Sequence, residues 1–263
     1  HMGQPNTAPH CLSTYSLFEG IKNAGFKVAL TGEGADELFG GYERFGAALR
    51  TEDDWIADYL DKFGPFKGSL RREVLTRNFY NVANGVSSRI SEFTARIEKT
   101  KPGIDRLNTL QGLDQWDRFP YYILRRADHL SMAHAVEVRI PFCQPKILDF
   151  ARKLPIEHRL SDGKSKRVVY EAASDLVPQS ILDRKKQPFT LPVVAMIKKG
   201  EKLFDYMESV FLGEKFINRG YFDSNKINDF LALQAREPSA DLANMLWSVM
   251  VFELWHRNVD DMN

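Results

Sequence analysis

The chain of 263 residues has few cysteines and no long apolar run. Its two cysteines, Cys11 and Cys143, match neither a metal-ligand spacing nor a disulfide framework, so we expect a reducing compartment, by default the cytoplasm. Because no apolar run could span a bilayer and no signal peptide opens the sequence, we expect no membrane partner. Neither sign of charge is in excess, with 36 basic and 35 acidic residues. A nucleic-acid partner is therefore not expected either.

What is present, 43% hydrophobic residues over this length, suffices for one large or two small packed domains. We expect residues 1–10 to be a tag remnant and a loop. An apolar face over residues 12–21 predicts a helix that ends near Gly25. The short apolar run at 28–30 then predicts a buried strand.

Beyond that strand the pattern is helical almost throughout. A helical insertion is expected over about 50–118, and one long helix over 117–138 leads into an extended piece at 138–142. The positions expected on the buried side of this helix are Leu124, Leu130, Met132 and Ala135. The stretch 241–257 is apolar around the whole circumference of a helix, which predicts a buried helix. We expect a single strand among roughly ten helices, with no sheet partner for it downstream.

The most informative segment, residues 28–42, has the sequence VALTGEGADELFGGY. Gly32 and Gly34 let the turn adopt positive φ or approach a ligand closely, and a strand–turn–helix junction directs N–H groups at anions. The segment also carries three carboxylates: Glu33, Asp36 and Glu37. Because these would repel a bare phosphate, phosphate binding would need a bridging cation such as Mg²⁺. A surface turn with an acidic helix start explains the spacing equally well.

Three blocks of sequence resemble the asparagine synthetase (glutamine-hydrolysing) family. They are TGEGADELFGGY at 31–42, HLSMAHAVEVRIPF at 129–142 and ILDRKKQPF at 181–189, in the family's order. Residues 11–263 are identified as the C-terminal part of the family's ATP-dependent synthetase domain. The resemblance implies an α/β fold of the ATP-pyrophosphatase (adenine nucleotide alpha hydrolase-like) type, present here as a mostly helical portion with one or few parallel strands.

The resemblance also implies an activity. The family transfers AMP from ATP to a carboxylate, aspartate in the namesake, with release of pyrophosphate, and ammonia or another amine then attacks the acyl-adenylate. In the namesake, which serves amino-acid biosynthesis, the ammonia comes from an N-terminal glutaminase domain. Relatives close β-lactams or macrolactams with an internal amine, and this remains an alternative. A non-catalytic binding or assembly module on the same fold is a second alternative.

The resemblance assigns roles to residues of the acidic turn and the basic loop. Asp36 matches the ligand of Mg²⁺ on the phosphates of ATP, and Gly32 and Gly34 belong to the nucleotide-binding turn. Glu33 lies where the family has a carboxylate near the attacking amine; β-lactam-forming relatives carry tyrosine there, so Glu33 favours the asparagine-synthetase type of reaction. Lys186 matches the lysine that stabilises pyrophosphate and the developing negative charge.

Three further residues belong to the predicted site. Arg184 adds to the positive field of the basic loop on the nucleotide side. Arg126 and Asp128 lie on the helix that aligns with the family's substrate-side helix. An ion pair along the helix face explains those two residues equally well.

Two features of the family do not occur in this sequence. The pyrophosphate loop, Ser-Gly-Gly-x-Asp-Ser, is absent, and neither cysteine has the position of the glutaminase nucleophile. We therefore expect the rest of the sheet and half of the phosphate site from an N-terminal synthetase half, whether a separate polypeptide or sequence outside this chain, and possibly a glutaminase domain as well. The chain alone is expected to bind ATP weakly and not to turn over.

Overall fold

The computed structural model describes most of the chain. The described residues are 1–50, 64–65, 67–82, 106–161, 164–184 and 191–260, together with Tyr59, Glu92, Ala95 and Phe189. They divide into two compact units. Unit 1 comprises His1, Thr14–Ile56 and Ile90–Phe189, and unit 2 comprises Met2–Ser13, Ala57–Arg89 and Thr190–Asn263. Much of the predicted insertion at 50–118 and all of 185–188 lie outside the described residues.

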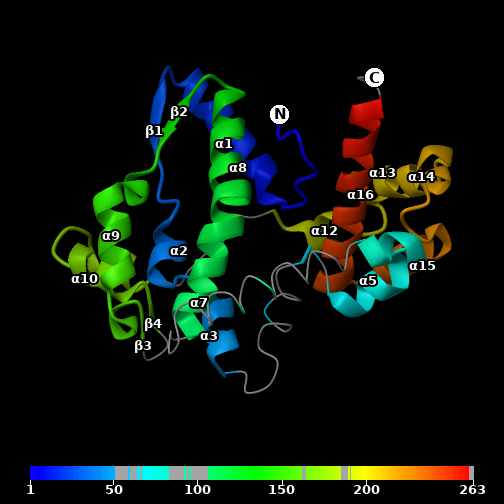
Figure 1. The fold of residues 1–263 in the computed structure, drawn as a ribbon. Coiled ribbons are helices and arrows are strands. Elements are labelled where there is room, and N and C mark those ends of the chain that lie inside the picture. Colours follow the sequence, from blue (N-terminus) through cyan, green and yellow to red (C-terminus); the bar gives the residue numbers. More distant parts are fainter. Residues whose placement is uncertain are drawn as a thin grey trace. The chain divides into compact units, whose positions relative to one another are not determined.

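The chain begins with the predicted helix and strand. Helix α1 (His10–Asn23) starts at the last residue of the predicted loop, and Gly25 follows it with φ +85°. Strand β1 (Val28–Leu30) pairs in parallel with β2 (Glu137–Arg139), in the register Val28↔Glu137 to Leu30↔Arg139 (Figure 1). The prediction of no downstream partner was wrong, because β2 has only three residues and its Glu-Val-Arg sequence shows no apolar run.

The prediction that β1 is buried was also wrong. Val28 is 47% exposed and Leu30 is 73% exposed, and Phe26, which precedes them at the same alternation, is exposed too. Within the described part of the chain, β1 pairs with β2 alone, so its other edge and this face have no covering element. An apolar run predicts burial only where a second layer is present to bury it.

The long helix expected over 117–138 has different bounds and is not uniform. Helix α7 (Arg106–Leu113) continues into the π-helix η1 (Asp114–Leu124) and then α8 (Arg125–Met132). The helix ends early because the chain turns before β2, with Ala135 at φ +55°. Met132 and Ala135 are therefore exposed rather than buried as predicted. An eleven-residue π-helix is unusual, since π-helices mostly occur as single turns, often at functional sites.

The remaining described elements of unit 1 are short. They are α2 (Ala35–Phe39), α3 (Glu43–Arg50), η2 (Pro141–Cys143), α9 (Pro145–Lys153), η3 (Ile156–His158), β3 (Leu160–Ser161), β4 (Lys164–Ser165), α10 (Arg167–Ala173) and α11 (Gln179–Leu182). Strands β3 and β4 form an antiparallel hairpin. Leu38 and Phe39 of α2 pack with Ala151 of α9 in a small apolar cluster, which fixes α2 beneath the acidic turn.

Unit 2 is helical, and its described residues form an extensive apolar core. It contains α5 (Gly68–Val74), α12 (Val193–Met196), α13 (Lys202–Phe211), α14 (Glu214–Arg219), α15 (Ser224–Arg236) and α16 (Ala240–Asp260). Helix α16 contacts α12, α13 and α15, which confirms the predicted buried helix at 241–257. Its Trp247 donates an indole hydrogen bond of 2.8 Å to the carbonyl of Thr7.

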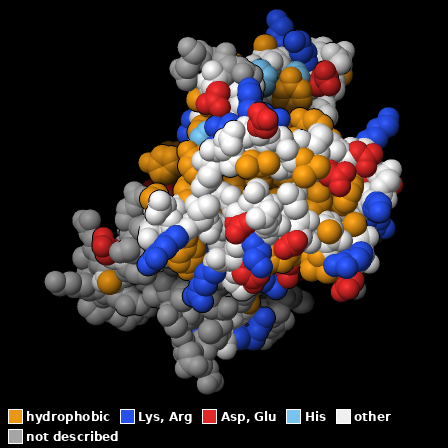
Figure 2. All heavy atoms as spheres, turned by 90° about the vertical axis from the view of Figure 1, so that its right-hand side faces the viewer, with side chains coloured by type: hydrophobic (Ala, Val, Ile, Leu, Met, Phe, Trp, Pro, Cys, Tyr) orange, Lys and Arg blue, Asp and Glu red, His pale blue; other side chains and the backbone are white. Residues whose placement is uncertain are grey.

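The described surface agrees with the composition. Acidic and basic side chains lie interspersed among apolar ones on the face drawn in Figure 2. Cys11 and Cys143 are both free thiols. Among the described helices, none has the length and apolar character needed to cross a membrane.

Candidate active site

The acidic turn has the predicted strand–turn–helix form. After β1 the N–H of Thr31 donates to the carbonyl of Arg139, and Gly34 turns the chain into α2 with φ +93°. A Cβ on Gly34 would lie 3.1 Å from Cζ of Phe119, whereas a Cβ on Gly32 would meet nothing within 4 Å. Gly34 is therefore required by backbone conformation and internal packing. Gly32 faces open space, as a residue beside a ligand would.

Asp36 forms an ion pair with a residue that sequence reasoning missed. Lys166 Nζ lies 2.9 Å from Asp36 Oδ1, and both side chains are partly exposed. Lys166 adopts a left-handed conformation with φ +53°, which is uncommon for a residue with a Cβ, and its N–H donates to the carbonyl of Phe39. Such outliers occur often at functional sites. No local sequence pattern connects positions 36 and 166, which are brought together by α2, β4 and α10.

The second glycine of the Gly-Gly pair makes room for the Asp36 carboxylate. A Cβ on Gly41 would lie 1.8 Å from Asp36 Oδ1, so only glycine fits at this position. Among the described residues there is no group of three or more His, Cys, Asp or Glu side chains that could hold a metal ion. A single carboxylate such as Asp36 is compatible with a Mg²⁺ that takes one protein ligand and completes its shell with phosphate and water oxygens, the usual arrangement in nucleotide sites.

Glu33 is paired with the predicted substrate residue Arg126. The Nη2 atom of Arg126 lies 2.6 Å from Glu33 Oε1, across two separate elements, so the pair is not a contact along one helix face. Arg126 is almost fully buried, whereas the Glu33 side chain is 30% exposed. Asp128 is exposed, and two residues along an α-helix it lies about 200° around the axis from Arg126. The structure therefore brings Arg126 to the turn and leaves Asp128 on another side of α8.

Glu37, the third carboxylate, lies beneath the turn. It accepts a short hydrogen bond from the Tyr42 hydroxyl, and burial raises the pKa of Glu37 above its ordinary value despite that hydrogen bond. Burial, followed by the negative charge of Glu37, also raises the pKa of Tyr42. Gln111 donates to the Glu37 carbonyl at 3.0 Å and accepts from the buried Arg159. Glu37 thus supports the turn from inside, a role that its place in the acidic run did not indicate.

The basic loop is only partly described. Arg184 follows α11 and is exposed. Lys186 lies outside the described residues, so its predicted position beside the phosphates stays a prediction. The described cations beside the acidic turn are instead Lys166 and Arg126.

A short parallel strand pair leading into a glycine turn and an acidic helix belongs to an α/β fold of the ATP-pyrophosphatase type, mostly helical in this chain. The family model for asparagine synthase matches residues 1–257. The chain is a member of the asparagine synthase family.

Individual relatives agree with this assignment. The chain is 25% identical to asparagine synthetase (glutamine-hydrolyzing) 1 of Bacillus subtilis over 293 aligned residues, which cover 97% of the chain and 44% of that protein. It is 27% identical to asparagine synthetase (glutamine-hydrolyzing) 3 of the same organism, over 62% of the chain and 26% of the relative. The chain is 26% identical to the amidase chyE of Penicillium rubens, over 67% of the chain and 34% of that protein. The chain thus spans less than half the length of each.

Proposed function

We propose that this chain is the C-terminal part of the synthetase domain of an ATP-dependent amide ligase. The ligase adenylates a carboxylate, releases pyrophosphate and passes the acyl group to ammonia or an amine. The observation that carries the proposal is the geometry of one glycine turn, where two partly exposed carboxylates, Glu33 and Asp36, each hold a cation from a distant part of the chain. Family membership supports the same chemistry.

Asp36 and Lys166 form the nucleotide side of the proposed site. Mg²⁺ bound there would neutralise charge on the phosphate oxygens of ATP. Asp36 would hold the cation with the carboxylate that glycine at 41 accommodates. Lys166, whose constrained backbone keeps its ammonium beside Asp36, would supply a point charge for phosphate oxygens. Lys186 and Arg184 would add positive charge to the same side.

Glu33 forms the acceptor side. A carboxylate near the attacking amine can accept its proton or hold it in position for attack. Arg126, buried behind Glu33, keeps this carboxylate in one orientation and offers a planar guanidinium that also suits a substrate carboxylate. Glutamate at 33, rather than tyrosine, favours a reaction of the asparagine-synthetase type with aspartate as the default acceptor.

The exposed strand supports the need for an N-terminal synthetase half. On the face that shows Val28 and Leu30, the paired positions on β2 are Glu137 and Arg139, which form an ion pair at 3.0 Å. Among the described residues of this strand pair, the apolar surface therefore lies on the β1 side, next to the edge at which they form no further strand pairing. An apolar strand edge of this kind pairs readily with a further strand. We propose that the strand carrying the Ser-Gly-Gly-x-Asp-Ser loop, from outside this chain, lies there.

The test is ATP–pyrophosphate exchange and AMP release, with a panel of amino acids and amines, by the chain alone and with its N-terminal half. We expect activity only in the combination, and Asp36→Asn should abolish it because the amide cannot replace a charged metal ligand. Asp149→Asn, at an exposed position on α9, is the matched control. Exchange by the chain alone would refute the need for a partner. A combination without AMP release for any acceptor would favour a non-catalytic module.

A further inference from the structure

Two arginines, Arg118 and Arg126, lie over the ring of one tyrosine, Tyr122, along η1 and α8. The Cζ atom of Arg118 lies 4.9 Å from the ring centroid of Tyr122, and that of Arg126 lies 5.4 Å from the same centroid. The three residues are spaced four apart along a continuous helical run, which keeps their side chains on neighbouring turns of one face. Guanidinium groups at these distances are attracted by the aromatic ring.

The stack connects the interior of unit 1 to the acidic turn. At its inner end Arg118 lies 5.7 Å from the ring centroid of Tyr42, whose hydroxyl donates to buried Glu37. At its outer end Arg126 holds Glu33 at 2.6 Å. Glu33 itself lies between Gly32 and Gly34, on backbone that glycine leaves conformationally permissive. Its orientation therefore depends on a partner that is fixed from elsewhere.

We propose that Tyr122 is a positioning residue for the acceptor side of the site. Its ring fixes the plane of the Arg126 guanidinium, and Arg126 then fixes the carboxylate of Glu33. This inference rests on the proposed function, in which Glu33 lies beside the attacking amine. Tyr122 acts through Arg126 on Glu33, so its effect should fall on the amine step and not on nucleotide binding.

The kinetic test uses the chain combined with its N-terminal half. Tyr122→Leu should lower kcat for amide formation about 10- to 100-fold, the effect of misplacing a group by about 1 Å, while KM for ATP changes less than about twofold. Tyr122→Phe, which keeps the ring face, should restore most of kcat. The matched control is Tyr121→Leu, because Tyr121 is the adjacent residue on η1 and its side chain is mostly exposed. Equal losses in Tyr122→Leu and Tyr122→Phe would overturn the proposal.

A second variant covers the case in which Tyr122→Leu does not fold. Arg126→Lys keeps the charge that pairs with Glu33 but loses the planar group that stacks on the ring. The same loss of kcat, with KM for ATP unchanged, is expected. A wild-type kcat in Arg126→Lys would show that planar stacking is not needed and would overturn the proposal.

A double-mutant cycle on the chain alone needs no activity. The Tm shifts of Tyr122→Leu and Glu33→Gln should be non-additive by about 2–4 °C, and additive once Arg126→Met is also present. Additive shifts in both backgrounds would show that Tyr122 is merely structural. If the cycle shows coupling but no wild-type combination forms an amide, the stack is correct and the proposed function is wrong.

Discussion

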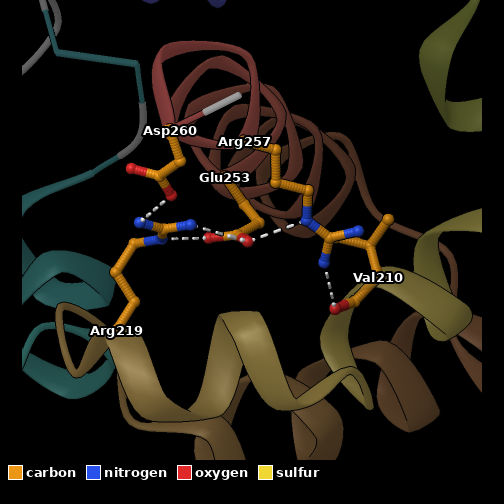
Figure 3. Close-up of polar contacts among 5 residues, drawn as sticks. All are labelled: Val210, Arg219, Glu253, Arg257 and Asp260. Carbon is orange, nitrogen blue, oxygen red and sulfur yellow. Dashed lines mark hydrogen bonds and ion pairs between the residues drawn. The ribbon is translucent and has the colours of Figure 1, made fainter. Parts of the chain in front are cut away.

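The two units of this chain hold their carboxylates in different ways. In unit 2, Glu253 is only 1% exposed, and both of its oxygens accept from arginines, Arg219 at 2.7 Å and Arg257 at 2.9 Å (Figure 3). Arg219 also pairs with Asp260, and Arg257 donates to the carbonyl of Val210. This network joins α13 and α14 to α16.

Two carboxylates at the acidic turn of unit 1, Glu33 and Asp36, are more exposed than Glu253. Asp36 and Glu33 are 26% and 30% exposed, and their described ion pairs have one cation each, Lys166 and Arg126. A buried and fully hydrogen-bonded carboxylate resists exchange of its partners, whereas a half-exposed pair can be opened by an incoming ion. The comparison indicates that Glu253 holds the helices of unit 2 together, whereas Glu33 and Asp36 in unit 1 stay accessible to ligands.

The largest effect is expected where the network of unit 2 is broken. Glu253→Gln leaves two arginines beside a neutral group in a buried site, and it should cost about 3–5 kcal/mol of unfolding free energy. Asp260→Asn, at the exposed end of the same network, should cost less than about 1 kcal/mol. Denaturant unfolding followed by the fluorescence of Trp247 and Trp255 measures both variants. Similar costs for the two substitutions would show that the burial of Glu253 does not give its ion pairs a greater effect on stability.

A smaller effect is expected at the turn of unit 1. Gly41→Ala places a Cβ against Asp36, because a Cβ at this position would lie only 1.8 Å from Asp36 Oδ1. Overpacking of this kind costs about 1–3 kcal/mol, and the displaced carboxylate should also bind Mn²⁺ more weakly. Gly20→Ala on α1 is the control. A Cβ at Gly20 would have no neighbouring atom within 4 Å, and alanine favours a helix. Unchanged Mn²⁺ binding in Gly41→Ala, measured by electron paramagnetic resonance, would contradict Asp36 as the metal ligand.

Sequence alone predicted the parts of this structure that depend on local pattern. The helix at 10–23, the strand at 28–30, the glycine turn and the buried helix at 240–260 are confirmed, because apolar periodicity and glycine placement determine them within a few residues. The acidic turn was singled out for the same reason. Its glycines and carboxylates are adjacent in sequence.

The contacts that complete the candidate site could not be predicted in this way. Glu33 and Arg126 are separated by 93 residues, and the partners Asp36 and Lys166 by even more. Such pairs follow from how α2, α8 and α10 pack, which no local pattern encodes. The pairing of β1 with β2 was missed for a related reason, since three residues are too few for a periodic signal. The exposure of β1 shows the opposite error, where a local apolar run predicted burial that depends on a second layer.

The smallest expected effects are opposite responses of the two units to pH. Burial raises the pKa of Glu37 above 4.5, so folded unit 1 binds this proton more tightly than the unfolded chain, and stability falls as pH rises from about 4.5 through the raised pKa. Burial, then the charge of Arg219, lowers the pKa of His256 below 6.5. Unit 2 therefore loses stability as pH falls from about 6.5 through the lowered pKa, because the unfolded chain gains the proton first.

Thermal unfolding across pH 4 to 8 measures both responses, with Trp116 reporting on unit 1 and Trp247 and Trp255 on unit 2. Glu37→Gln should flatten the pH profile of unit 1 alone, and His256→Asn should flatten the pH profile of unit 2 alone. Each change should be less than about 1 kcal/mol of unfolding free energy, because neighbouring groups offset part of each pKa shift. Parallel pH profiles in the two units would show that these groups do not determine the response. A change in unit 2 caused by Glu37→Gln would show that the two units unfold together.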